Sequence, residues 1–144
     1  MRSFVLKAFE QIVAAGKVRL FRSHKPEYKD GQQLRDFIYV KDAVDMTLFF
    51  LDNPGIGGLF NIGTGDARTW NDLVTAVFAG MYKNPDIEYI DMPQSIRNQY
   101  QYFTQADITK LKQAGYSKKI TSLEDAITDY VRNYLKKDGY LTGC

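Results

Sequence analysis

Basic and hydrogen-bonding side chains gather in the stretch between Arg19 and Arg35. A guanidinium is planar and permanently charged and can hold two phosphate oxygens at once, so this stretch has the chemistry of a phosphate site. Runs of charge more often face water, in which case Arg35 would pair with an acidic neighbour. Spacing alone leaves both interpretations open and favours the second. The members are Arg19, Arg22, Ser23, His24, Lys25, Lys29 and Arg35.

Common catalytic arrangements are missing from the sequence. His24 is the only histidine and Cys144 the only cysteine, so the nitrogen and sulfur ligands of a zinc site cannot be assembled within the chain. A serine–histidine triad would need His24, which has no nucleophile-elbow sequence nearby. Residues 63–65 (Gly-Thr-Gly) lack the third glycine of a dinucleotide loop, which predicts a structural turn. No tyrosine is followed four residues later by lysine. We therefore expect no catalytic residue and no metal site.

Composition limits the class of protein. The chain has 144 residues, 44% of them hydrophobic, which is enough for one folded domain. A formal charge of +2 gives no reason to expect nucleic acid or a membrane as partner. Cys144 cannot form an intrachain disulfide, which favours a cytoplasmic location. No stretch of the sequence has the length and apolarity of a membrane span or a signal peptide.

Apolar periodicity predicts alternating helices and short strands, and hence a mixed α/β class. No internal repeat or low-complexity linker interrupts the pattern. Helices are expected at residues 4–13, 43–51, 69–81, 104–115 and 121–134, and strands at residues 17–22, 34–40, 58–62 and 87–90.

Helix starts are predicted from short polar side chains. Thr69, Thr104 and Thr121 each precede an acidic residue by three positions, the spacing of a capping box. Asp42 is expected to cap the helix that begins at residue 43. The sequence shows no clear cap before the first helix, so we expect Met1 to be an internal position at the boundary of a fragment.

Two linked motifs resemble a known superfamily. Residues 35–42 (Arg-Asp-Phe-Ile-Tyr-Val-Lys-Asp) and 60–65 (Phe-Asn-Ile-Gly-Thr-Gly), followed by the segment 122–127, resemble the C-terminal half of extended short-chain dehydrogenase/reductases that act on nucleotide sugars. Within that superfamily, residues 20–24 and 100–107 are similar to the ADP-glyceromanno-heptose 6-epimerase family. The resemblance spans nearly the whole chain.

The resemblance implies an NADP-dependent epimerase of ADP-linked heptose in the synthesis of lipopolysaccharide precursors. In that family the cofactor removes hydride from one carbon and returns it to the other face, while a tyrosine and a lysine move the proton. The family's catalytic pair, its cofactor loop and its N-terminal Rossmann domain would all lie upstream of Met1. We therefore expect the 144 residues to be a substrate-binding domain that is inactive alone and does not hold NADP tightly.

The resemblance also carries over substrate contacts, position by position. Arg35 matches a contact to the diphosphate. Tyr100 matches one on the opposite wall, although an aromatic residue ahead of a helix is more often packing. Lys7 occupies a contact position where other members can carry histidine. Four consecutive residues match the segment that lines the nucleotide-sugar site: Phe21, Arg22, Ser23 and His24.

Further expectations concern partners. In extended members of the superfamily, residues equivalent to 35–57 pack on the cofactor domain, and the family tends to form homo-oligomers. We expect Phe37, Tyr39, Phe49 and Phe50 to contribute to a surface that is exposed without that domain. Two alternatives stay open: a fragment of another nucleotide-sugar epimerase, dehydratase or reductase, and a freestanding binding module.

Overall fold

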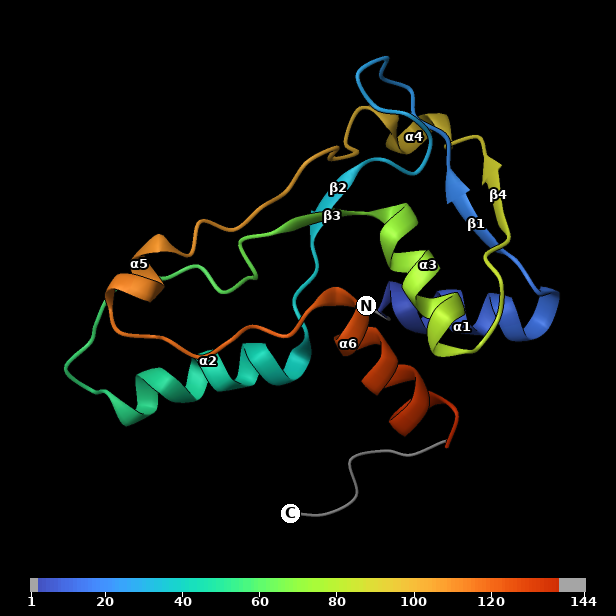
Figure 1. The fold of residues 1–144 in the computed structure, drawn as a ribbon. Helices are drawn as coiled ribbons and strands as arrows, with labels where there is room; N and C mark the ends of the chain where they lie inside the picture. Colours follow the sequence, from blue (N-terminus) through green and yellow to red (C-terminus); the bar gives the residue numbers. More distant parts are fainter. Residues whose placement is uncertain (1–2, 138–144) are drawn as a thin grey trace.

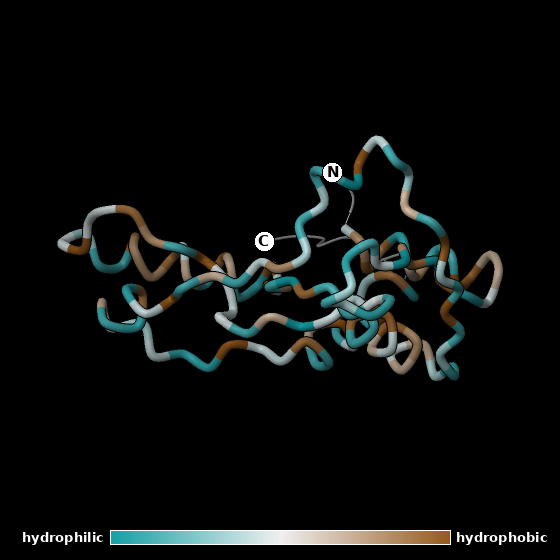
Figure 2. The backbone as a smooth tube through the Cα atoms, turned by 90° about the horizontal axis from the view of Figure 1, so that it is seen from above, coloured by the Kyte–Doolittle hydropathy of each residue, from teal (hydrophilic) through white to brown (hydrophobic). Residues whose placement is uncertain are grey.

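The computed structural model describes residues 3–137. Helices and short strands alternate along it, as predicted, in an elongated arrangement (Figures 1 and 2). In chain order the elements are α1 (Phe4–Ala15), β1 (Val18–Phe21), β2 (Leu34–Asp36), α2 (Val40–Asp52), β3 (Ala67–Thr69), α3 (Trp70–Gly80), β4 (Ile87–Ile90), α4 (Gln94–Arg97), α5 (Thr109–Gln113), α6 (Leu123–Asp129) and the π-helix η1 (Tyr130–Leu135).

The cap of α3 agrees with the sequence-based prediction, and those of α1 and α6 correct it. Thr69 and Asp72 form the predicted capping box of α3. The expectation that α1 lacks a cap is wrong, because the Ser3 side chain accepts a hydrogen bond from Leu6 N at 3.2 Å. Helix α6 is capped by Ser122 rather than by the neighbouring threonine.

Two small sheets organise the strands. β1 and β4 pair in parallel, with Val18 opposite Ile87, and β2 and β3 pair antiparallel, with Leu34 opposite Thr69. The predicted strand at residues 58–62 is absent. Its backbone is held by side chains instead, since Lys110 Nζ donates to Leu59 O at 2.7 Å. The strand that does form, β3, lies closer to α3.

Tertiary contacts also shift two predicted helix starts. α2 begins at Val40, so Asp42 lies in its first turn, where its carboxylate accepts from Thr121 N at 3.0 Å rather than capping the helix. The helix expected from Thr104 begins only at Thr109. Thr104 N donates to Leu34 O at 3.1 Å, so residues 103–106 run beside β2 instead.

Two hydrophobic cores lie at the two ends of the molecule (Figure 1). The larger core joins α1, α3, β1 and α6 around Phe78, and the smaller joins α2 to α5 around Met46 and Leu111. Together they order residues on both sides of β2 and β3. Across residues 3–137, the helices are too short or too polar to cross a bilayer.

The expected exposed aromatic surface is only partly correct. Phe37 packs against the larger core, with its ring centroid 5.0 Å from that of Trp70, while Phe49 and Phe50 pack against the smaller core. Tyr39 is half-buried and donates a hydrogen bond to Asp129. The large hydrophobic side chains of α2 that are exposed are aliphatic, at i, i+4, i+8 and i+11: Val40 (61%), Val44 (51%), Leu48 (48%) and Leu51 (71%).

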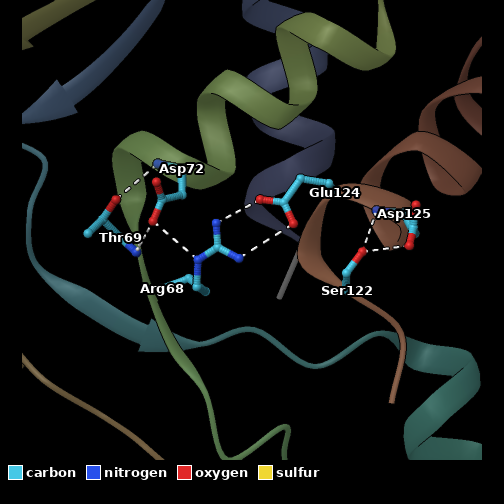
Figure 3. Close-up of polar contacts among 6 residues, drawn as sticks. All are labelled: Arg68, Thr69, Asp72, Ser122, Glu124 and Asp125. Atoms are coloured by element: carbon cyan, nitrogen blue, oxygen red, sulfur yellow. Dashed lines mark hydrogen bonds and ion pairs between the residues drawn. The ribbon is translucent and has the colours of Figure 1, made fainter. Parts of the chain in front are cut away.

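Arg68, in β3, ties the start of α3 to the start of α6 (Figure 3). Its guanidinium donates to Glu124 Oε1 at 2.7 Å and Glu124 Oε2 at 3.4 Å, and to Asp72 Oδ2 at 3.3 Å. The hydrogen bond to Arg68 lowers the pKa of Glu124 and raises that of Arg68. These contacts of Arg68 join α3, whose first residue is Trp70, to α6 in the larger core.

Asp129 ties α6 to the start of α2. Lys41 Nζ donates to its Oδ2 at 2.8 Å, and Tyr39 donates to the same oxygen. The hydrogen bond from Lys41, with help from Tyr39 and Asn133, lowers the pKa of Asp129 to about 2. Burial and the Asp129 contact raise the pKa of Tyr39 to about 12. The phenol is therefore neutral at physiological pH and acts as a structural donor.

Candidate ligand-binding site

A cavity of about 450 Å³ opens between α1, β1 and the start of α3. It brings together three of the predicted site residues, Lys7, Phe21 and Tyr100. Aromatic rings form much of its wall, and two cationic side chains, Lys7 and Arg19, contribute to it. The lining residues are Phe4, Lys7, Gln11, Arg19, Leu20, Phe21, Gln33, Trp70, Ile90 and Tyr100.

Local structure explains this convergence. Phe4, Lys7 and Gln11 recur at three- and four-residue intervals on α1, so the helix presents them on one face. Gln11 Oε1 accepts a hydrogen bond from Arg19 N at 3.0 Å, which fixes the helix against β1. Trp70 is the first residue of α3, directly after the capping threonine. Most of the cavity wall is therefore built on helices and strands, with Gln33 and Tyr100 added from the segments between them.

Arg35 lies beside the cavity, against Tyr100. Its Cζ is 5.5 Å from the centre of the Tyr100 ring, and its guanidinium donates to Leu34 O at 3.1 Å and to Gln101 O. Within residues 3–137 it makes no ion pair with an acidic side chain, which counts against the interpretation of Arg35 as paired to an acidic neighbour. Its charge is therefore held in place but not neutralised by a described carboxylate.

Burial shifts the pKa values of Arg35 and Tyr100. Burial lowers the pKa of Arg35 below its ordinary value, although Tyr100 acts in the other direction. Burial raises the pKa of Tyr100, against the opposing effects of Arg35 and the Trp70 indole. Tyr100 is thus a neutral phenol at physiological pH, available as donor or acceptor, while the guanidinium stays charged.

The other three predicted residues lie outside the cavity lining. Arg22 is exposed and its Nη1 is 3.9 Å from Asp91. The side chain and amide of Ser23 are hydrogen-bonded within their own loop. The backbone N–H of His24 donates to the Tyr102 hydroxyl at 3.0 Å. The structure places this loop next to the tyrosine-rich segment but does not bring its side chains together with Lys7.

Sequence reasoning missed several lining residues, among them Gln33 and Trp70. Gln33 is 1% exposed although it ends a stretch that is polar in sequence, so its surroundings could not be read from the sequence. Trp70 was recognisable only as the residue after a helix cap, although it is the one tryptophan of the chain. Its ring lies between Phe4 and Phe37, with centroid distances of 4.7 and 5.0 Å.

The turn at residues 63–65 does not fit the phosphates of a cofactor. Its amides already donate to the Asp36 carboxylate, from Thr64 N at 2.8 Å and from Gly65 N at 3.0 Å. Ala106 N adds a third backbone hydrogen bond at 3.0 Å, and Thr64 Oγ1 a fourth contact at 2.6 Å. An added Cβ on Gly63 would lie 2.4 Å from the Ala106 Cβ, so the turn needs glycine for packing.

The protonation state of Asp36 follows from these contacts. Burial acts to raise the pKa of Asp36, but the hydrogen bonds from Thr64, Ala106 and Gly65 outweigh it and hold the pKa below its ordinary value. The carboxylate is therefore ionised and fully engaged by the turn. Residues 63–65 form a structural turn around this carboxylate, as predicted.

Comparison with known proteins agrees with this architecture. The model of the NAD dependent epimerase/dehydratase family matches residues 1–63. An ADP-L-glycero-D-manno-heptose-6-epimerase of Nitratidesulfovibrio vulgaris is 58% identical over 94% of the chain, and one of Fusobacterium nucleatum is 46% identical over 98%. The chain is homologous to part of the ADP-L-glycero-D-manno-heptose-6-epimerases. It matches 42% and 45% of the length of these two relatives, respectively.

Solved structures show the same fold. The ADP-L-glycero-D-manno-heptose-6-epimerase of Helicobacter pylori matches 92% of the chain with a TM-score of 0.74 and 26% identity. The UDP-glucose 4-epimerase of Thermus thermophilus, solved with NAD, matches 90% with a TM-score of 0.68 and 24% identity. The chain covers 38% and 40% of these proteins. The predicted class, part of an extended short-chain dehydrogenase/reductase, is confirmed.

Proposed function

We propose that this chain is the substrate-binding portion of an NADP-dependent epimerase that interconverts ADP-D-glycero-D-manno-heptose and ADP-L-glycero-D-manno-heptose. The observation that carries the proposal is the close similarity, over nearly the whole chain, to proteins of that name. The enzyme would act in the cytoplasm on a precursor of lipopolysaccharide, as a homo-oligomer.

The geometry of the cavity supports a nucleotide-sugar ligand. Aromatic walls at Phe21 and Tyr100 suit a flat base or a sugar face, and charge from Lys7 and Arg35 suits the diphosphate. The Tyr100 ring belongs to the aromatic wall of the cavity and also lies beside the Arg35 guanidinium, so it connects the aromatic and the charged regions of the site. Arg22, Ser23 and His24 would contact the ligand only where it extends beyond the cavity.

We further propose that hydride and proton transfer depend on residues that this sequence does not contain. The amides of Thr64 and Gly65 already donate to Asp36, which leaves neither of them to bind a phosphate of NADP. Residues 35–57 would pack on a cofactor domain, in which case the aliphatic stripe of α2 supplies the contact. The exposed fractions of Val40 and Leu51, 61% and 71%, support this role.

Calorimetric titration of the 144-residue chain tests the proposed function. We expect ADP-heptose to bind at least tenfold more tightly than UDP-glucose, and no epimerised product to form when NADP is added. Equal affinities for the two nucleotide sugars would contradict the assignment to the ADP-heptose enzymes. Turnover by the chain alone would contradict the proposal that its catalytic groups lie elsewhere.

A further inference from the structure

Two buried N–H donors on the wall of the cavity lack a hydrogen-bond partner. Among the described residues, Gln33 Nε2 and Trp70 Nε1 are the buried side-chain nitrogens for which no acceptor of good geometry is found. Both residues line the cavity, and Gln33 is 1% exposed. A buried donor without an acceptor loses its hydrogen bonds to water and gains none in return, so donors of this kind are rarely retained without a partner.

The fold places these two residues next to each other on the cavity wall. Trp70 N donates to Gln33 O at 3.3 Å, so the backbones of the two residues are joined. Phe4 and Phe37 contact the indole edge to face and fix the plane of the ring. A hydrogen-bonding contact from the Trp70 indole lowers the pKa of the Tyr100 hydroxyl, but this contact falls outside ordinary hydrogen-bond geometry. A ligand in the cavity would therefore meet two side chains with N–H groups to donate.

The surroundings of the donors favour a neutral heteroaromatic ring over a phosphate. The nearest groups are aromatic, whereas the cationic side chains stand on α1, β1 and beside Tyr100. Neutral N–H groups suit the lone pairs of ring nitrogens, and a purine carries several such acceptors on a flat ring that can pack on aromatic walls. A diphosphate would gain more from Lys7 and Arg35.

We propose that Gln33 and Trp70 form a base-recognition subsite, in which their side-chain N–H groups donate to ring nitrogens of the purine base of the ligand. This inference rests on the proposed function, since it assumes that an adenine nucleotide enters the cavity. It assigns a specificity-determining role to two residues outside the predicted diphosphate contacts. The phosphates then extend toward Arg35, past the Tyr100 ring.

Because the chain has a single tryptophan, its indole N–H gives one diagnostic signal in a proton–nitrogen NMR spectrum. Addition of ADP should move the Trp70 indole proton downfield, as expected for a new hydrogen bond, whereas inorganic pyrophosphate should leave it in place. An indole signal that stays still at saturating ADP would overturn the subsite. That result would leave a measured preference for ADP-heptose over UDP-glucose, and hence the proposed function, intact.

Two variants test the same subsite through their affinities for ADP and pyrophosphate. Gln33→Met keeps the side-chain length, and Trp70→Phe keeps an aromatic ring between its neighbours. Each should weaken ADP binding about 3- to 10-fold, the equivalent of one neutral hydrogen bond, and leave pyrophosphate affinity unchanged. Unchanged ADP affinity, or an equal loss for pyrophosphate, would overturn the inference. If neither ADP nor ADP-heptose binds the unmodified chain, both the subsite and the proposed function fail.

Discussion

Asp36→Ala is expected to lower the free energy of unfolding by about 2–4 kcal/mol, the largest stability effect we predict for a single side chain. The Asp36 carboxylate accepts hydrogen bonds from Thr64, Gly65 and Ala106, and so joins β2 to two loops that are distant in sequence. Without it, three backbone amides lose their acceptor at once. Urea unfolding followed by circular dichroism measures the change.

The pH dependence of stability should change in the same variant. The pKa of Asp36 is lower in the folded chain than its ordinary value, so its contribution to the free energy of unfolding is fully present above the pKa of the unfolded chain. This contribution is lost as the pH falls through the pKa of the folded chain. The difference in stability between the unmodified chain and Asp36→Ala should therefore be larger at pH 7 than at pH 3.

Asp66→Ala is the matched control for Asp36→Ala. Asp66 belongs to the same turn but is exposed, so its removal should change the free energy of unfolding by less than about 0.5 kcal/mol. Similar losses in the two variants would show that the turn tolerates the removal of its central acceptor. That result would contradict the structural role given to residues 63–65.

Arg35→Ala is expected to weaken ADP-heptose binding roughly 10- to 150-fold, corresponding to the loss of charge-assisted hydrogen bonds. The structure adds a second reason for a large effect. The guanidinium donates to the Gln101 carbonyl and lies beside the Tyr100 ring, so the opposite wall of the site loses a support. Arg35→Lys should recover only part of the affinity, because an ammonium lacks the planar fork. Calorimetry measures both variants.

Arg132→Ala provides a close control for the Arg35 variants. Arg132 also donates to a backbone carbonyl, that of Gly80 at 3.3 Å, and its Cζ also lies over a tyrosine ring, 4.2 Å from the centre of Tyr82. Arg132 belongs to η1 and contacts Gly80, the last residue of α3, whereas the cavity is lined by Trp70, the first residue of α3. An effect of Arg132→Ala on affinity as large as that of Arg35→Ala would remove Arg35 from the binding site.

The sequence predicted the elements whose signals are local. The apolar period of α3 and the Thr69 capping box were sufficient to place that helix, and Gly16 ends α1 in the left-handed conformation that favours glycine. The mixed α/β class followed from the alternation of such elements. The motif at residues 35–42 predicted the superfamily, which the comparisons support.

The errors arose where a distant partner outweighed a local preference. Asp42 resembles a helix cap in sequence, but its acceptor oxygens serve Thr121, a residue 79 positions away. Thr104 has the spacing of a capping box, yet the pairing of its segment with β2 delays the helix until Thr109. No local pattern contains those partners, so periodicity and capping rules cannot find them.

The residues of the candidate site also differ in whether a local sequence signal indicated them. Lys7, Phe21 and Tyr100 meet at the cavity, which could be expected from the family resemblance but not from their spacing. Gln33 gave no signal, because its burial depends on α1 and α3 packing over a loop that is polar in sequence. Local chemistry therefore indicated the charged groups better than the buried neutral donors.

The central claim is that the cavity beside Tyr100 and Arg35 receives a nucleotide sugar. Backbone amide shifts during titration of the 144-residue chain with ADP-heptose test it most directly. We predict the largest changes at Lys7, Phe21, Arg35 and Tyr100, and none at Arg132 in η1. Saturable shifts centred away from the cavity, or the absence of shifts at millimolar ligand, would contradict the claim.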